Sequence, residues 1–316
     1  MAGYKEVDLD KIKSVSIKKR KNKVTVKNFA GISNKKTFEA FWESLPDILA
    51  GGDIRRVVNA VRRAVERKKP VIWLMGAHVI KVGLSPIVID MMKRGYITAV
   101  GMNGAGAIHD AEAAMIGATS EDVGLNISDG TFGMSEETAD LINPAVNAGV
   151  LEGLGFGEAV GRRIEESKLP FGEYSILAAA YRMRVPATVH LAVGTDIVHM
   201  HPSFDGACAG DATHRDFRIA AHEIGRVGGG GVIFVVGSSV ILPLIVEKSL
   251  SVASNMGKNI EKFTGVNLDF IRHYRPGLNP VKRALEHGGE GITITGHHEL
   301  TVPLIYWALR TGAGLD

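Results

Sequence analysis

The stretch that decides the fold is residues 71–78, Val-Ile-Trp-Leu-Met-Gly-Ala-His. Its first five residues are all apolar, as expected for a strand that is covered on both faces. Upstream of it, apolar residues recur at i, i+3, i+4, i+7 and i+11 from Ile54 to Val65, and Pro70 ends this pattern. Such spacing is typical of an amphipathic helix. The chain therefore moves from a helix to a buried strand that ends at a glycine.

The same alternation continues towards the C-terminus. Further strands are predicted at residues 97–102, 187–193, 232–236, 266–271 and 291–295, and helices at 84–94, from 108, and at 213–224, 243–256 and 298–310. This order predicts an α/β, Rossmann-like fold, with a mostly parallel sheet and helices on both faces. Ligands bind beyond the carboxyl ends of the strands in such sheets. Glycines stand at these ends: Gly76, Gly104, Gly106, Gly194, Gly237 and Gly296.

Composition excludes several classes of protein. The 316 residues are 45% hydrophobic, which excludes a disordered chain, and a formal net charge of +3 makes nucleic acid an unexpected partner. No run approaches the ~18 apolar residues of a membrane helix. The single cysteine, Cys208, excludes an intramolecular disulfide. With no secretory signal at the N-terminus, we expect a cytoplasmic protein.

Residues 1–35 differ from the rest of the chain. Nine lysines and arginines face three acids in the first thirty residues, and two short alternating runs flank Lys18–Lys23. This pattern predicts a basic N-terminal arm or a β-hairpin. Nucleic-acid binding is one interpretation, but we favour an arm that packs on a neighbouring subunit. Residues 36–316 are predicted to form one α/β nucleotide-binding domain with a helical insertion near 122–184.

Small residues after the strands are candidates for binding a cofactor. A strand that opens through small residues into a helix presents backbone N–H groups to an anion. Asn103-Gly104-Ala105-Gly106 has this form, although a tight turn that needs small residues for packing would look the same. Gly237 and the two serines after it are a second candidate. The predicted cofactor-binding residues are Gly76, Asn103, Gly104, Ala105, Gly106, Thr195, Gly237, Ser238, Ser239 and Gly296.

Polar residues are densest in residues 194–202, Gly-Thr-Asp-Ile-Val-His-Met-His-Pro. On an extended chain His199 and His201 would point the same way and could share a divalent metal with a carboxylate such as Asp211. Alternatively, they are hydrogen-bonded pocket residues. The histidines after the last predicted strand suit acid–base work, or cap the following helix. The predicted catalytic residues are Asp110, Asp196, His199, His201 and His297.

Taken together, these loops resemble the deoxyhypusine synthase family. Met75-Gly76-Ala77-His78-Val79 and Asn103–Gly106 match its dinucleotide-contacting loops in order and spacing, and Val236–Val240 is similar to its Gly-Gly-Gly-Val loop. Ala192–Asp196 resembles its Ala-Leu-Thr-Asp-Gly segment, which implies that Asp196 contacts cofactor or substrate. The resemblance implies a Rossmann-like fold, NAD as cofactor, and a homotetramer with active sites at subunit interfaces.

The departures from this family concern its chemistry. Leu242-Pro243-Leu244 stands where the family has Lys-His-His, and no lysine matches the family's Trp-Gly-Lys segment; Lys282 would reach the site only in a rearranged loop. A Schiff base needs a positioned amine, so deoxyhypusine synthesis itself is not expected. The leading hypothesis is an NAD-binding transferase or oxidoreductase that acts on a small polar or amine substrate. The alternatives are a metal-dependent hydrolase or lyase that uses His199 and His201, and a non-catalytic nucleotide-binding protein.

Overall fold

The sheet of the protein is built from six parallel strands in the order β3-β2-β1-β4-β5-β6. The computed structural model describes residues 3–314; residues 1, 2, 315 and 316, which belong to the predicted arm and domain, lie outside the described residues. This order has its switch point between β1 and β4, as in Rossmann folds. It confirms the predicted fold class. The strands are β1 Val71–Met75, β2 Ala99–Asn103, β3 Ala187–His190, β4 Val232–Val236, β5 Thr264–Asp269 and β6 Glu290–Thr295.

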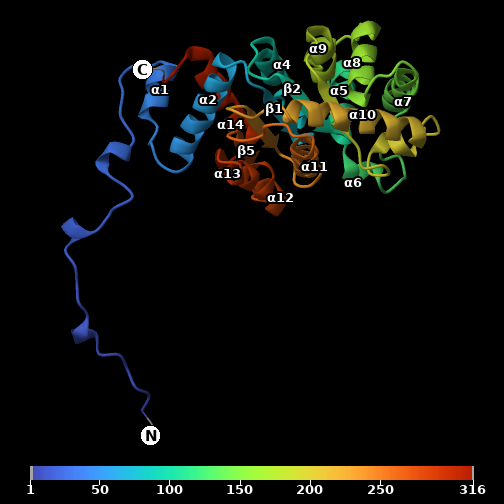
Figure 1. The fold of residues 1–316 in the computed structure, drawn as a ribbon. Helices are drawn as coiled ribbons and strands as arrows, with labels where there is room; N and C mark the ends of the chain where they lie inside the picture. Colours follow the sequence, from blue (N-terminus) through green and yellow to red (C-terminus); the bar gives the residue numbers. More distant parts are fainter. Residues whose placement is uncertain (1–2, 315–316) are drawn as a thin grey trace.

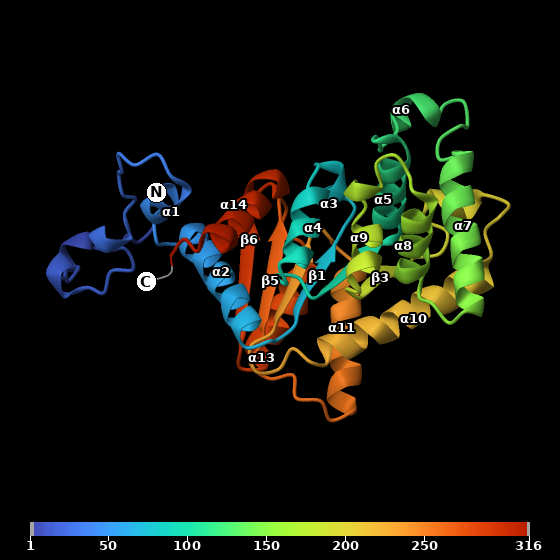
Figure 2. The same ribbon diagram turned by 90° about the horizontal axis from the view of Figure 1, so that it is seen from above.

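Helices cover both faces of this sheet (Figures 1 and 2). Side chains alternate between the faces of a strand, so β1 sends Trp73 into one core and Ile72 and Leu74 into the other. The Trp73 ring packs 4.9 Å from the ring of Phe234 in β4. The first core is completed by helices that include α2 Ala50–Glu66, α4 Ser85–Lys93 and α14 His298–Thr311, and the second by α11 Ile241–Asn255 and α13 Arg283–Glu286.

The predicted helical insertion lies at the β3 end of the sheet (Figure 2). Its elements are α6 Val123–Asn126, α7 Glu136–Leu151, α8 Phe156–Ser167, η4 Gly172–Tyr174 and α9 Ile176–Met183. The remaining elements are α1 Phe38–Ser44, α3 His78–Lys81, α5 Gly104–Ile116, η5 Ile197–Met200, α10 Gly206–Ile224, α12 Tyr274–Pro276 and η6 Gly277–Lys282. Within residues 3–314, no helix is both long and apolar enough to cross a membrane.

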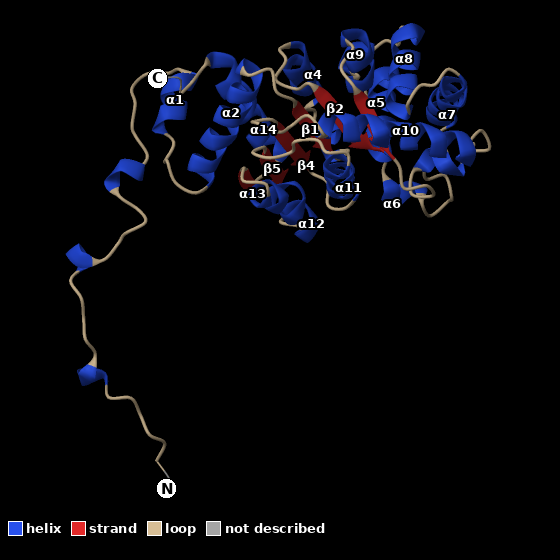
Figure 3. Cartoon of the chain, viewed as in Figure 1, coloured by secondary structure: helices blue, strands red, loops and turns tan. Residues whose placement is uncertain are grey.

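The N-terminal segment extends away from the body of the protein (Figures 1 and 3). Residues 3–37 contain only three short turns, η1 Leu9–Lys11, η2 Ile17–Lys19 and η3 Val26–Asn28, and no strand. Of the two forms expected for this segment, the hairpin is therefore not formed. The alternating runs are only three residues long, and an isolated two-stranded hairpin is marginal in water.

Candidate functional site

The carboxyl ends of all six strands meet at one edge of the sheet because every pairing is parallel. The segments that begin at Gly76, Gly104, Leu191 and Gly237 therefore leave the sheet side by side. We call this edge the rim. The neighbourhoods of residues 104, 196 and 237, each of which follows a predicted strand, lie along this rim.

At the switch point the loops after β1 and β4 are in direct backbone contact. A Cβ at Gly76 would overlap the carbonyl oxygen of Gly237. The Gly76 amide donates to Val236 O at 2.9 Å, and the Gly237 amide donates to Leu268 O at 3.0 Å. Gly237 has φ +62°, a left-handed conformation that favours glycine. The two loops thus meet with no side chain between them, at the place where α/β sheets bind ligands.

His298, at the start of α14, lies buried against this crossing. Its Nε2 is 3.1 Å from Leu268 O, which can only accept, so the proton is on Nε2 and Nδ1 is an acceptor. That Nδ1 is buried and has no hydrogen-bond partner within residues 3–314. Burial lowers the pKa of His298, so the ring is neutral at pH 7. The rings of His78 and Phe270 lie 5.4 and 5.9 Å from it.

The loop after β4 leads into the N-terminus of α11. Ser238 is buried and its Oγ accepts from the Leu242 amide at 3.4 Å, while Ser239 is half-buried. The N-cap residue Val240 makes no side-chain cap of its own, and the first turn, Ile241-Leu242-Pro243-Leu244, carries no acid. The dipole end of α11 thus faces the rim uncovered by negative charge.

The N-terminus of α5, by contrast, is already filled. The Asn103 side chain accepts from the Gly106 amide at 3.1 Å, and the Asp196 carboxylate accepts from the Ala105 amide. A Cβ at Gly104 would overlap Asp196 Oδ2. The prediction that this loop holds a phosphate is therefore corrected, because a carboxylate occupies the anion position. Burial raises the pKa of Asp196 to about 6.

His199 faces Asp196 from η5. Its Nδ1 accepts from the amides of Gly194, at 3.1 Å, and Asp196, at 3.2 Å. The proton of the neutral ring is thus on Nε2, which lies 3.9 Å from Asp196 Oδ2 and is buried with no hydrogen-bond partner in the described chain. Burial lowers the pKa of His199.

The predicted metal site is not assembled. The chain turns through η5 instead of running extended, so His199 and His201 do not converge. His201 Nδ1 is 2.7 Å from Ser203 Oγ, and Asp211 pairs with Arg215. Among residues 3–314 there is no group of three or more side chains that could hold a metal ion.

A cavity of about 230 Å³ lies between α5 and the loop after β3. Asp196 and Thr195, two of the predicted residues, line it. Sequence reasoning missed the charged groups that complete its wall, which come from α3, α5 and the loop after α5. These are Lys81, His109, Glu112 and Glu121. Through Lys81, the short helix after β1 also contributes to the wall of this cavity.

The other predicted residues are spread more widely. Asp110 is fully buried and accepts from Ser175 Oγ and from the amides of Ile176 and Leu177, so it caps α9 instead of facing the rim. His297 is exposed on the rim, with its ring stacked 6.0 Å from that of Phe270. The Gly296 amide donates to Asp269 O at 3.0 Å.

Lys282 lies at the opposite edge of the sheet. The neighbouring carbonyls of Pro280 and Val281 abut Gly265 and Gly291, the second residues of β5 and β6. The Lys282 amine is 3.6 Å from Glu286. Lys282 therefore does not supply a reactive lysine at the rim.

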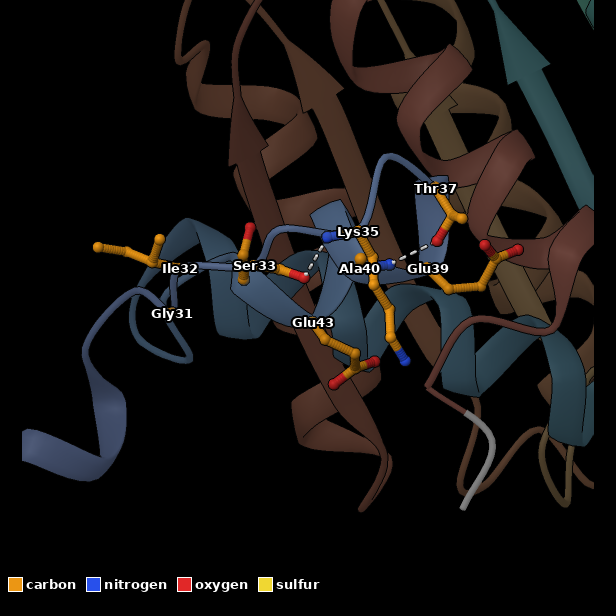
Figure 4. Close-up of a pocket in the computed structure, with 9 residues that line it drawn as sticks. Gly31, Ile32, Ser33, Lys35, Thr37, Glu39, Ala40 and Glu43 are labelled. Carbon is orange, nitrogen blue, oxygen red and sulfur yellow. Dashed lines mark hydrogen bonds between the residues drawn. The ribbon is translucent and has the colours of Figure 1, made fainter.

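A hollow of about 410 Å³ between the arm and α1 is also distant from the strand ends (Figure 4). Within it Ser33 Oγ accepts from the Lys35 amide at 3.2 Å, and Thr37 Oγ1 accepts from the Ala40 amide at 3.3 Å. These bonds shape the turn before α1, so we do not include the hollow in the candidate site.

No protein-family model matches the chain, and no curated protein matches it. Among solved structures, it is similar to ArgZ, an arginine dihydrolase from the ornithine–ammonia cycle in cyanobacteria, with 16% identity, a TM-score of 0.50, and coverage of 83% of this chain and 32% of ArgZ. It is also similar to AgrE in its ternary complex with ornithine and NAD+, with 13% identity, a TM-score of 0.52, and coverage of 82% of this chain and 32% of AgrE.

The chain thus spans about a third of the length of ArgZ and AgrE. A protein from Entamoeba histolytica assigned as a deoxyhypusine synthase matches with 11% identity and a TM-score of 0.47, over 84% of this chain and 89% of that one. At these identities the comparisons show the Rossmann-like fold alone. Membership of the deoxyhypusine synthase family stays a prediction.

Proposed function

We propose that the protein binds NAD across the switch point between β1 and β4 and acts on a small polar, amine-bearing substrate by oxidoreduction or NAD-assisted group transfer. The observation that carries this proposal is the contact between Gly76 and Gly237, where two strand ends meet without side chains beside an open helix N-terminus. AgrE, whose fold is similar, was solved with NAD+ and ornithine. This likeness is an analogy of fold.

The residues at the switch point fit such a cofactor. Ser238, Ser239 and the first turn of α11 would hold its phosphates, because this turn carries no acid and Val240 at its N-cap offers no side-chain acceptor. The buried Nδ1 of His298 is an acceptor that still needs a donor. When bound, NAD supplies a hydride acceptor. The chain itself would position the cofactor through these groups.

The cavity beside Asp196 suits the substrate. Three carboxylates, those of Glu112, Glu121 and Asp196, line it together with one lysine, Lys81. This excess of negative charge favours a ligand with a positive charge, such as an ammonium group. Because burial raises the pKa of Asp196 to about 6, its carboxyl group exchanges a proton close to neutral pH.

We further propose that the protein is a homo-oligomer in which the arm packs on a second copy. Large apolar side chains of the arm, including Val7, Val15 and Val26, are more than 75% exposed. Nothing in residues 3–314 of the same chain covers them. A neighbouring copy would remove this surface from water.

Isothermal titration calorimetry with NAD+ tests the nucleotide site. We expect Ser239→Glu to weaken binding at least ten-fold, about 1.4 kcal/mol, because it places a carboxylate beside the pyrophosphate. The control is Ser254→Glu, at the exposed other end of α11, which should bind NAD+ like the wild type. Equal affinity of the wild type and Ser239→Glu, or no heat at millimolar NAD+, would contradict the proposal.

A second measurement separates an enzyme from a non-catalytic nucleotide-binding protein. Absorbance at the NADH band, followed with a panel of amino acids and polyamines, should rise with at least one of them. Binding of NAD+ without turnover on any member of the panel would favour the non-catalytic alternative.

A further inference from the structure

His109 lies one turn inside α5 and lines the cavity beside Asp196, yet the proposed function assigns it no part. Its side chain is 17% exposed, and its Nδ1 lies 2.6 Å from Thr119 Oγ1. Glu112, three residues further along the helix, lies on the same face of α5. The hydroxyl of Thr119 stands between the imidazole and the carboxylate.

The direction of the hydrogen bonds fixes the form of the imidazole ring. Thr119 Oγ1 donates its one hydrogen to Glu112 Oε2. A hydroxyl that has given its hydrogen away can only accept, so His109 Nδ1 must be the donor to Thr119. In the neutral ring Nε2 then carries a free electron pair, and no group within residues 3–314 hydrogen bonds it.

Glu112 is the acceptor at the end of this chain of hydrogen bonds. Burial acts to raise its pKa, but His109, whose Nδ1 lies 3.6 Å from Glu112 Oε2, and the hydroxyls of Thr119 and Thr138 outweigh burial and leave the pKa below its usual value. The carboxyl group is therefore ionised at neutral pH and only accepts. Thr138 Oγ1 approaches its other oxygen at 3.4 Å.

We propose that His109 is the general base of this cavity, with Thr119 and Glu112 as positioning residues. The inference rests on the proposed function in one respect, namely that a substrate enters the cavity. In the step, Nε2 takes a proton from an ammonium or hydroxyl group of the substrate. An N–H bond forms on the ring, the substrate's N–H or O–H bond breaks, and its electron pair stays on the substrate heteroatom.

Nearby carboxylates stabilise the positive charge that develops on His109 when it takes the proton. Glu112 compensates it through the Thr119 hydroxyl, an arrangement like other histidine–carboxylate pairs in catalysis. Facing it across the cavity are Asp196 from the loop after β3, Glu121 from the loop after α5, and Lys81 from α3. Three carboxylates against one lysine stabilise an imidazolium ion.

Nitrogen-15 NMR of the full-length protein tests the hydrogen-bond chain without any substrate. At pH 8.5, where a free imidazole is neutral, we expect His109 to carry its proton on Nδ1, with the resonance assigned by His109→Gln. Thr119→Val removes the hydroxyl and should abolish the preference for Nδ1–H, while Thr119→Ser should restore it. The matched control is Thr138→Val, on the other oxygen of Glu112, which should leave the tautomer of His109 unchanged.

Reactivity of Nε2 is measured with diethyl pyrocarbonate, a small electrophile, with His222 as an exposed internal reference on the same chain. We expect acylation at His109, and a rate about three- to ten-fold lower in Thr119→Val because the base loses its carboxylate support. A proton on Nε2 in the wild type, or an unchanged tautomer and rate in Thr119→Val, would overturn the inference. These measurements need no nucleotide, so their failure and a failure of NAD+ binding are distinguishable.

Discussion

At the scale of single residues, the buried Asp110 and the half-buried Asp196 show how surroundings decide the role of the same side chain. Asp110 receives three hydrogen bonds and caps α9, whereas Asp196 receives one from Ala105 and lines a cavity. Both follow a strand end in the sequence, so the sequence pattern does not separate them. The difference arises from residues that are far away along the chain, Ser175 for the first and Gly104 for the second.

The capping role of Asp110 leads to a prediction about stability. Asp110→Ala leaves three buried donors without a partner, and we expect it to lower the free energy of unfolding by about 3–4 kcal/mol. Asp205→Ala removes the exposed cap of α10 and should cost about 1 kcal/mol. Urea denaturation of both variants checks this, and similar losses at the two positions would speak against a buried cap.

The pH dependence of stability follows from three aspartates whose pKa is raised in the folded protein. Burial raises the pKa of Asp110 and Asp196 to about 6, and that of Asp216 to about 7. A carboxyl group whose pKa is raised on folding makes its full contribution to stability below about pH 4. This contribution is lost as the pH rises through the pKa of the folded state. Asp196→Asn cannot ionise, so relative to the wild type it should gain about 1–3 kcal/mol between pH 5 and pH 8. Denaturation curves of both proteins at pH 5 and pH 8 measure this gain. A stability difference between Asp196→Asn and the wild type that is the same at both pH values would refute the raised pKa of Asp196.

At the scale of elements, the apolar runs predict the strands, and the parallel order then places their carboxyl ends together. Residues 71–75 and 232–236 are strands at the expected bounds. The start of α10 was missed because its cap, Asp205, lies eight residues before the predicted helix. The contact of His109 with Thr119 and the burial of His298 could not be read from the sequence, because loop conformation and the packing of α14 determine them.

The contact between the loops after β1 and β4 gives a prediction at this scale. Gly76→Ala would force the added Cβ into the Gly237 carbonyl, and we expect a loss of about 2–4 kcal/mol. Gly210→Ala, in the middle of α10 with open space around it, should be neutral or stabilising by up to about 1 kcal/mol. Chemical denaturation compares the two. Equal stability of both variants would mean that the loops separate easily.

At the scale of the whole molecule, the contacts within a single chain do not explain the exposed apolar side chains of the arm. It carries exposed apolar side chains among its lysines and leaves the α/β body (Figure 1). The sequence indicated a separate basic segment, but its conformation follows from the absence of a partner strand within residues 3–37.

Sedimentation equilibrium tests the proposed role of the arm. We expect a mass that is a multiple of the 33.8 kDa chain. Val15→Lys with Ile17→Lys should shift the equilibrium towards the single chain, because both side chains would be buried in the contact. Leu151→Lys, at a residue that is more exposed but lies on α7, should not. A wild-type mass of one chain at micromolar concentration would exclude the arm contact.

The central claim is that the strand-end rim binds NAD at the switch point. A crystal structure of the protein grown with millimolar NAD+ tests it most directly. We expect density for the dinucleotide across the ends of β1 and β4, with its pyrophosphate between Gly76 and the Ser238–Ser239 turn. Density at the N-terminus of α5 in place of the Asp196 carboxylate, or at the opposite edge of the sheet, would contradict it.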